Sequence, residues 1–193
     1  MKLLASLTSP YARKLRVLAA ELGVELSVVE TAPLDDEADF LAVNPLGKVP
    51  VLVLDDGTAL VDSRVVAGYL LEQVPGNVLL AADGPAHWHG RTTEAIADGI
   101  LDAAIILRFN AGQGVTAGMW ANRQYRAIDR ALASLAGRVG DDFDFAAICT
   151  VVACEYLDLR FPAIDWRTAQ PKLADLQARF GGRSSLATTQ PPG

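Results

Sequence analysis

The stretch Asn44-Pro45-Leu46-Gly47-Lys48-Val49-Pro50-Val51-Leu52-Val53 decides how this chain folds. It begins with turn-forming residues and ends in an apolar run rich in β-branched side chains, so we predict a loop that leads into a strand. Pro50 lies at the mouth of that strand, where the missing N–H of proline is tolerated. If the Val49–Pro50 peptide bond is cis, the backbone N–H and C=O of Val49 point away from the sheet and can pair with an extended peptide. The stretch therefore predicts a backbone site for a small peptide.

A strand and a helix are predicted before this stretch. Residues 2–7 are an apolar run of strand length, and Ser9-Pro10 is typical of a helix start, with serine as the N-cap and proline as the first helical residue. Gly23 is expected to end that helix. The chain thus begins with a strand followed by a helix.

The rest of the first eighty residues continues this alternation. Residues 25–31 alternate as a second strand, and a further helix is expected to begin at Asp62 or Ser63. Two strands joined by a tight hairpin turn are predicted over residues 49–54 and 58–61. This order predicts a thioredoxin-like α/β domain that spans residues 1–80.

After residue 80 the pattern becomes helical throughout. Residues 86–193 predict an all-helical bundle, the second domain. Residues 145–157 are apolar almost all round, which predicts a buried central helix capped by Asp144. The final residues, 188–193, predict no ordered structure.

Composition excludes several classes of protein. A net charge of −6 and a pI near 4.9 argue against a nucleic-acid surface, and no apolar stretch approaches the ~18 residues of a membrane span. Cys149 and Cys154 lack metal-ligand spacing, so we read them as buried thiols in a reducing compartment and expect a cytoplasmic protein. His87 and His89 diverge on a helix, so we expect no metal.

Three stretches together resemble the glutathione S-transferase family. They are Ser9-Pro10-Tyr11 before an Arg-rich helix, the Asn44–Pro50 loop, and the Asp62-Ser63 pair. The resemblance covers nearly the whole chain and implies a thioredoxin-like domain followed by a helical one, glutathione as co-substrate, and a homodimer. In that family the proline corresponding to Pro50 is cis, and the residue before it pairs with the cysteinyl backbone of glutathione.

Two hydroxyl groups are candidates for the catalytic residue. Ser9 at a helix start is what capping alone would select, but a hydroxyl and free N–H groups at a helix N-terminus also favour an anion. The resemblance implies that this anion is the glutathione thiolate. Thr8 is the alternative, because some classes of the family carry the active serine one place earlier relative to the proline.

Other residues match the family's ligand contacts. The resemblance implies that Asp62 and Ser63 bind the γ-glutamyl end of glutathione, although simple N-capping explains this pair equally well. Lys48 would neutralise the glycyl carboxylate, or is merely solvated. An electrophile pocket is expected to involve Tyr11, Arg108 and Trp120.

The sequence thus predicts a glutathione transferase that activates bound glutathione for attack on a small electrophile, by conjugation or glutathione-assisted isomerisation. The alternative is a non-catalytic module of the same fold that binds glutathione, another ligand or a protein.

Overall fold

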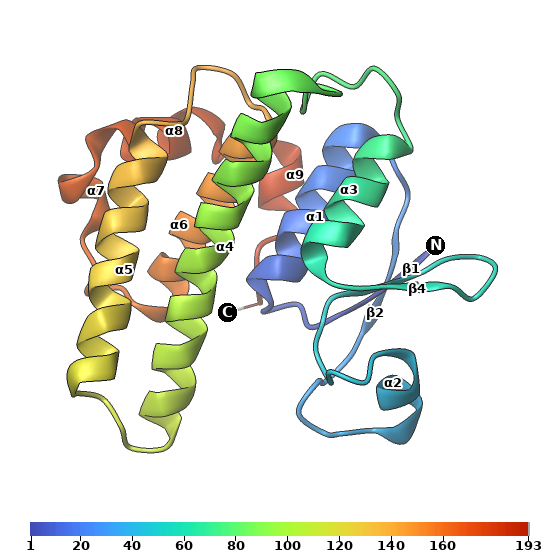
Figure 1. Ribbon diagram of the computed structural model, residues 1–193, viewed down its shortest axis with the longest axis horizontal. Helices are drawn as coiled ribbons and strands as arrows, with labels where there is room; N and C mark the ends of the chain where they lie inside the picture. Colours follow the sequence, from blue (N-terminus) through green and yellow to red (C-terminus); the bar gives the residue numbers. More distant parts are fainter. Residues whose placement is uncertain (193) are drawn as a thin grey trace. The chain divides into compact units, whose positions relative to one another are not determined.

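A computed structural model describes residues 1–192 of the chain (Figure 1). They form two compact units, one made of residues 1–77 with the C-terminal segment that begins at Arg183, and one made of residues 78–182. No helix within residues 1–192 combines the length and the apolar character needed to cross a membrane.

The first unit is built on a four-stranded sheet in the order β2-β1-β3-β4. The strands are β1 (Lys2–Ala5), β2 (Ser27–Glu30), β3 (Val51–Val53) and β4 (Ala59–Leu60). β1 runs parallel to β2 and antiparallel to β3, with Leu3 opposite both Val28 and Leu52. β3 pairs with β4 in antiparallel fashion. This mixed sheet confirms the predicted thioredoxin-like fold.

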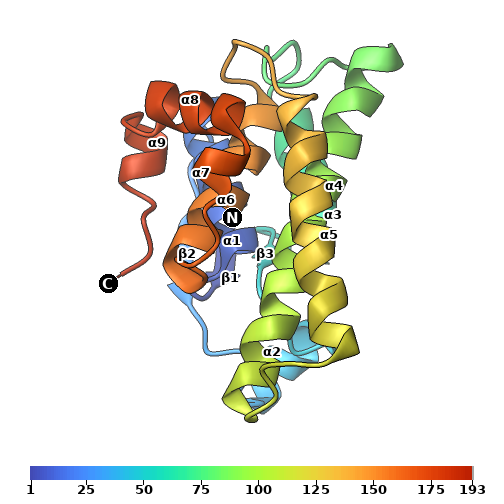
Figure 2. The same ribbon diagram turned by 90° about the vertical axis from the view of Figure 1, so that its left-hand side faces the viewer.

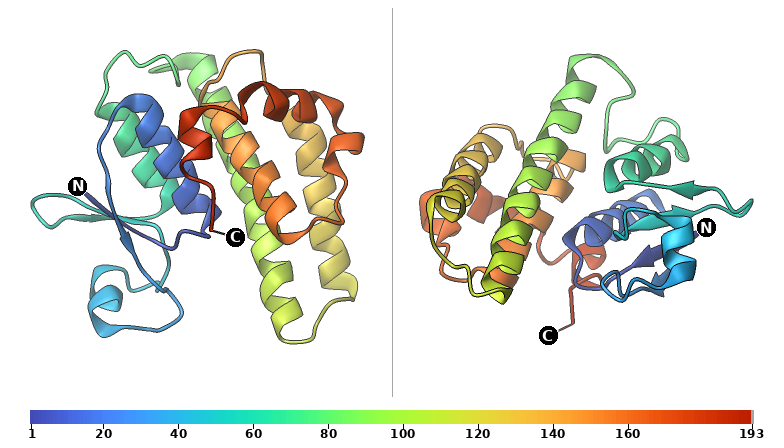
Figure 3. Two further views of the ribbon diagram at one scale, coloured as in Figure 1. Left: turned by 180° about the vertical axis from the view of Figure 1, so that it is seen from behind. Right: turned by 60° about the horizontal axis from the view of Figure 1, so that its bottom comes forward.

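Helices lie on both sides of this sheet. They are α1 (Pro10–Leu22), α2 (Ala38–Val43) and α3 (Ser63–Glu72), and the short α9 (Ser184–Ala187) packs on α1. Figure 3 shows α1 and α3 on one side of the sheet and α2 on the other. Leu15 and Leu18 of α1, with Val66 and Leu70 of α3, are fully buried and form the core between these helices and the sheet.

The second unit is helical, as predicted. It contains α4 (Gly84–Gly112), α5 (Met119–Ala136), α6 (Phe145–Arg160), α7 (Trp166–Ala169) and α8 (Pro171–Phe180). The long α4 packs against both α5 and α6 (Figure 2). α6 is buried over almost its whole length, and the Asp144 carboxylate accepts a hydrogen bond from the Ala147 N–H at 2.8 Å. The predicted central helix and its cap are both confirmed.

The end of the chain differs from the sequence prediction. Thr188 follows α9 directly, and Thr189 is only 6% exposed because its hydroxyl donates to the carbonyls of Ser185 and Leu186. The expectation of disorder was wrong for these two residues, because the polar composition of the C-terminal residues does not predict their contacts with α1. Gly193 lies outside the described residues.

Candidate functional site

Ser9 occupies the N-cap of α1. Its backbone is extended, with φ −75° and ψ 121°, and its Oγ accepts a hydrogen bond from the Ala12 N–H at 3.3 Å. A serine hydroxyl carries one proton of its own to donate. Within residues 1–192 the Ser9 hydroxyl donates to no partner. The capping role therefore leaves the O–H free for an anion at the helix end.

Thr8, the rival hydroxyl, lies one residue before the cap. Its Oγ1 is 3.2 Å from the Ser6 Oγ, and either atom can be the donor. Thr8 makes no capping bond to α1. These contacts favour Ser9 as the activating residue, and the choice between the two stays a prediction.

Asn44 shapes the loop that precedes β3. This residue is 2% exposed, its side-chain amide donates to the Lys48 carbonyl at 2.7 Å, and its Oδ1 accepts from the Leu46 N–H at 3.1 Å. Its carbonyl accepts from the N–H of Gly47, which has a φ of +59°. Sequence reasoning read Asn44 only as a turn former and missed it as the internal scaffold of the loop, although Asn at a turn start was a signal for side-chain to backbone bonds.

Val49 presents the backbone groups predicted to receive a peptide. The Val49–Pro50 bond is cis, as the resemblance implied. Among the described residues, neither the N–H nor the C=O of Val49 has a hydrogen-bond partner, because β3 begins only at Val51. Both groups are therefore available to an extended ligand. The Lys48 side chain beside them is exposed.

Asp62 and Ser63 form the start of α3. The Asp62 Oδ1 accepts from the Arg64 N–H at 3.0 Å, so Asp62 is the N-cap, and the Val61–Asp62 peptide bond is also cis. Asp62 is exposed, whereas Ser63 is 4% exposed. One carboxylate oxygen caps the helix, and the Asp62 residue remains exposed, so capping and ligand binding are compatible here.

The sheet brings these three stretches to one end. Leu4, near the end of β1, lies opposite Val51 at the start of β3. Leu60, the last residue of β4, lies opposite Leu52. Because both pairings are antiparallel, the chain leaves β1 toward Ser9, enters β3 from Pro50 and leaves β4 toward Asp62 at the same end of the sheet.

The predicted electrophile pocket is divided between the two units. Tyr11 is half-buried in the first turn of α1. Arg108 of α4 and Trp120 of α5 belong to the second unit and are exposed, Trp120 by 56%. The Arg108 guanidinium lies 5.8 Å from the Phe109 ring centroid. Their grouping into one pocket stays a prediction.

The C-terminal segment braces α1 at several points. The Arg13 guanidinium donates to the Leu186 carbonyl at 3.3 Å, and Arg16 donates to the Thr189 carbonyl at 3.4 Å. Burial, and then the charge of Arg13, lower the pKa of Arg16. No local pattern signalled these contacts, which join residues 173 positions apart.

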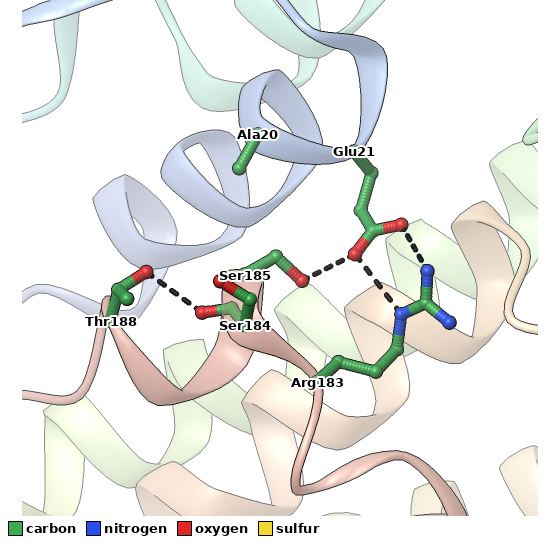
Figure 4. A pocket seen from close by; sticks show the side chains of 6 residues that line it. All are labelled: Ala20, Glu21, Arg183, Ser184, Ser185 and Thr188. Atoms are coloured by element: carbon green, nitrogen blue, oxygen red, sulfur yellow. Dashed lines mark hydrogen bonds and ion pairs between the residues drawn. The ribbon is translucent and has the colours of Figure 1, made fainter.

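Figure 4 shows the contacts of the C-terminal segment with the last turn of α1, around Glu21. Arg183 donates to both Glu21 oxygens, at 2.7 and 3.1 Å, and Ser185 donates to Oε1. Burial alone would raise the pKa of Glu21, but the bonds from Arg183 and Ser185 outweigh it and hold that pKa below its ordinary value. A surface pocket of about 420 Å³ opens beside these residues. It lies near the C-terminal end of α1, away from Ser9, so we do not assign it to the site.

A metal centre needs several donor side chains close together. Residues 1–192 contain no group of three or more His, Cys, Asp or Glu side chains placed to hold a metal ion. Cys149 and Cys154 are buried, and neither forms a disulfide.

Comparisons with known proteins agree on one family. Residues 8–73 match the model of the glutathione S-transferase N-terminal domain. The chain is 34% identical to the "Uncharacterized GST-like protein YibF" of Escherichia coli K12, over 100% of this chain and 99% of that protein.

Solved structures give the same result over the full length. A glutathione transferase family member from Pseudomonas fluorescens Pf-5 with bound glutathione is 38% identical, with a TM-score of 0.88 and coverage of 100% and 99% of the two chains. A glutathione S-transferase from Methylobacterium radiotolerans in complex with glutathione sulfonate is 33% identical, with a TM-score of 0.91 and coverage of 100% and 95%.

Proposed function

The chain belongs to the glutathione S-transferase family, and we propose that it activates the thiol of bound glutathione for attack on a small electrophile. The observation that carries this proposal is the Ser9 hydroxyl, which caps α1 and retains its proton for a further acceptor. Its place at the same end of the sheet as the unpaired backbone of Val49 supports a shared ligand. The reaction is conjugation or glutathione-assisted isomerisation.

The chemistry of the first step is a deprotonation. An unperturbed thiol has a pKa of about 8.5 and is mostly protonated at pH 7. A hydroxyl donor and the N-terminal end of α1 stabilise the thiolate relative to the thiol, and a depression of one to two pKa units corresponds to roughly 1.5 to 3 kcal/mol. The S–H proton leaves to solvent. The sulfur lone pair then forms the bond to the electrophilic carbon, while a leaving group departs from that carbon with its electron pair or the electrons of the carbon's double bond move onto the neighbouring atom. Holding both reactants together supplies much of the remaining rate.

The other residues hold the rest of the tripeptide. Val49, before Pro50, pairs with the cysteinyl backbone. The Asp62 carboxylate suits the γ-glutamyl ammonium, and Ser63 with the N-terminal end of α3 suits its carboxylate. Lys48 neutralises the glycyl carboxylate. The bound glutathione and glutathione sulfonate of the two related structures support this ligand.

The proposal also covers the residues that contact the electrophile, the oligomeric state and the cellular location. Tyr11, Arg108 and Trp120 contact the electrophile, and the arginine favours an acceptor that carries negative charge. The protein acts as a homodimer in the cytoplasm, where its two buried thiols stay reduced.

Calorimetric titration with reduced glutathione across pH 6 to 8 tests the proposal, with S-methylglutathione as the matched control that lacks an ionisable thiol. We expect binding accompanied by proton release for glutathione and binding without release for the S-methyl compound. Turnover with a panel of electrophiles then identifies the acceptor. Binding of glutathione without proton release would favour the non-catalytic binder, and absence of binding would favour an interaction module.

A further inference from the structure

Strand β2 lies at one edge of the sheet in the first unit. Among the described residues it pairs only with β1, in parallel. The N–H groups of Ser27 and Thr31 donate to carbonyl groups of the β1 segment, at 3.1 and 2.9 Å. Because the backbone groups of successive residues in a strand point to opposite sides, the N–H and C=O groups of Val28 and Glu30 point outward. These outward groups can bond to one further strand.

The side chains of β2 are exposed on both faces of the sheet. All four residues of the strand are exposed, and Val28 and Val29, which point to opposite faces, are 38% and 40% exposed. Proteins usually protect an edge strand with lysine, proline or a bulge. Residues 25–31 contain no lysine and no proline, and the register of β2 with β1 is continuous. The edge is therefore open to strand addition by a partner.

The residues around this strand carry only negative charge. Residues 24–39, which we call the acidic edge, contain six carboxylates and no Lys, Arg or His, so their formal charge of −6 equals that of the whole chain. In the described part of the chain none of these carboxylates makes an ion pair or a side-chain hydrogen bond. The carboxylates are all on exposed residues: Glu25, Glu30, Asp35, Asp36, Glu37 and Asp39. The charge of this surface is thus left for a cationic partner.

We propose that the acidic edge binds an extended, basic segment of another protein, which adds a strand to β2. The outward backbone groups of Val28 and Glu30 supply the hydrogen bonds, and the two exposed valines take β-branched or apolar side chains. Glu25 and Glu30 lie about 17 Å apart along an extended chain, so Lys or Arg residues five positions apart in the partner face both carboxylates. This interaction goes beyond the proposed function and does not depend on glutathione.

A basic segment fits the acidic edge better than other occupants do. Antiparallel pairing of β2 with the β2 strand of a second copy would bring two acidic edges together, and like charges across a strand pair are destabilising. Nucleic acids and anionic membranes are repelled by the same carboxylates. Since the ion pairs with a basic segment are exposed, they depend on several pairs together and weaken with salt.

A blocked peptide of sequence Lys-Val-Val-Thr-Val-Lys, titrated into the full chain and followed by NMR, tests the proposal. Two control peptides carry either Glu in place of both Lys, or methyl groups on the backbone nitrogens of the third and fifth residues, which face β2 when both lysines oppose the glutamates. We expect each control to bind at least about tenfold more weakly. Amide hydrogen exchange should slow at Val28 and Glu30 and stay unchanged at Ser27, whose N–H already bonds to the β1 segment.

Variants of the chain test the backbone and the charge of the edge separately. Val28→Pro removes an outward N–H and leaves the bonds to β1 in place, so we expect at least about a tenfold loss of peptide affinity. Glu25→Lys with Glu30→Lys should reverse the preference, so that the Glu peptide binds more tightly than the Lys peptide. The matched control changes the net charge equally at two exposed carboxylates elsewhere and should leave affinity within about twofold: Glu72→Lys with Asp175→Lys.

Three results would overturn the inference: no binding of the Lys peptide, equal binding of the Glu peptide, or slowed exchange away from Val28 and Glu30. Protection of these two amides that rises with protein concentration in the absence of peptide would also overturn it, in favour of a second copy. Should Val28→Pro fail to fold, as measured by circular dichroism, the double lysine variant and the exchange pattern still decide. None of the substituted residues belongs to the glutathione site, so peptide binding and the proposed function can fail independently.

Discussion

Helices α1 and α6 make the same kinds of contact at their two ends, but we assign a role in the glutathione site only to α1. Each begins with a side chain that accepts the N–H three residues on, Ser9 from Ala12 and Asp144 from Ala147. Each also carries, near its end, a carboxylate held by two bonds from a later arginine, Glu21 by Arg183 and Asp158 by Arg167. The α1 helix begins at the sheet end where the backbone groups of Val49 lack partners. A capping pattern alone therefore does not separate a functional helix start from a structural one; its surroundings do.

The substitution Ser9→Ala tests whether the hydroxyl at the start of α1 is catalytic. We expect turnover to fall about 100-fold, as for loss of a single donor to a developing anion, while loss of the cap costs only about 1 kcal/mol of stability. Ser9→Thr keeps both the hydroxyl and the cap and should retain most of the activity. Steady-state kinetics and thermal unfolding measure the two effects. Loss of turnover in Thr8→Ala with full activity in Ser9→Ala would move the role to Thr8.

The far end of α6 should give the largest purely structural effect. Asp158 accepts from both terminal nitrogens of Arg167 at 2.7 Å and from Trp166 Nε1 at 2.8 Å, and Trp166 is 1% exposed. Asp158→Ala leaves the buried Trp166 N–H without its acceptor and leaves Arg167 with only its bond to Gln177, so we expect a loss of about 2 kcal/mol in denaturant unfolding.

Asp141→Ala is the matched control for Asp158→Ala, because Asp141 pairs with Arg179 but is 94% exposed. It should cost less than about 0.5 kcal/mol. Equal losses in the two variants would show that burial of the indole N–H does not set the cost.

The Asp144 cap of α6 serves as a structural counterpart to the Ser9 cap of α1. Asp144→Ala should lower the free energy of unfolding by about 1 kcal/mol, and Asp144→Ser should recover most of it because serine also accepts at an N-cap. Glutathione affinity is expected to stay unchanged in both. Denaturant unfolding and calorimetry measure these quantities, and weaker glutathione binding in Asp144→Ala would contradict a purely structural role.

The contacts that sequence could predict are the local ones. Ser9-Pro10 and Asp144 predicted the starts of their helices because a cap acts on N–H groups a few residues away. The hairpin after Val53 was predicted from its turn residues. The Glu21–Arg183 pair joins residues 162 positions apart, and no periodicity encodes such a contact. Asn44 was visible as a turn former, but its burial depends on how the loop closes over it. The sequence therefore predicted the parts of the site that short local motifs determine. It did not predict the parts that depend on contacts between distant segments.

The far end of α1 gives the smallest effect, which depends on pH. The bonds from Arg183 and Ser185 lower the pKa of Glu21 in the folded state. Their stabilisation is therefore fully present above the unfolded-state pKa, about 4.3, and is lost as the pH falls through the lower folded-state value. Because the Arg183 side chain is 43% exposed, we expect Glu21→Gln to cost less than about 1 kcal/mol at pH 7, and progressively less as the pH falls and the Glu21 carboxylate becomes protonated.

Thermal unfolding of the wild type and Glu21→Gln between pH 3 and 7 measures this difference, with the exposed Glu25→Gln as control. The two curves should converge only in acid, whereas Glu25→Gln should follow the wild type throughout. Hydrogen exchange of the α9 amides locates the effect, since release of Arg183 loosens the segment that braces α1. A constant difference at every pH would mean that the Glu21 side chain acts through packing, and that its charge contributes nothing to the brace.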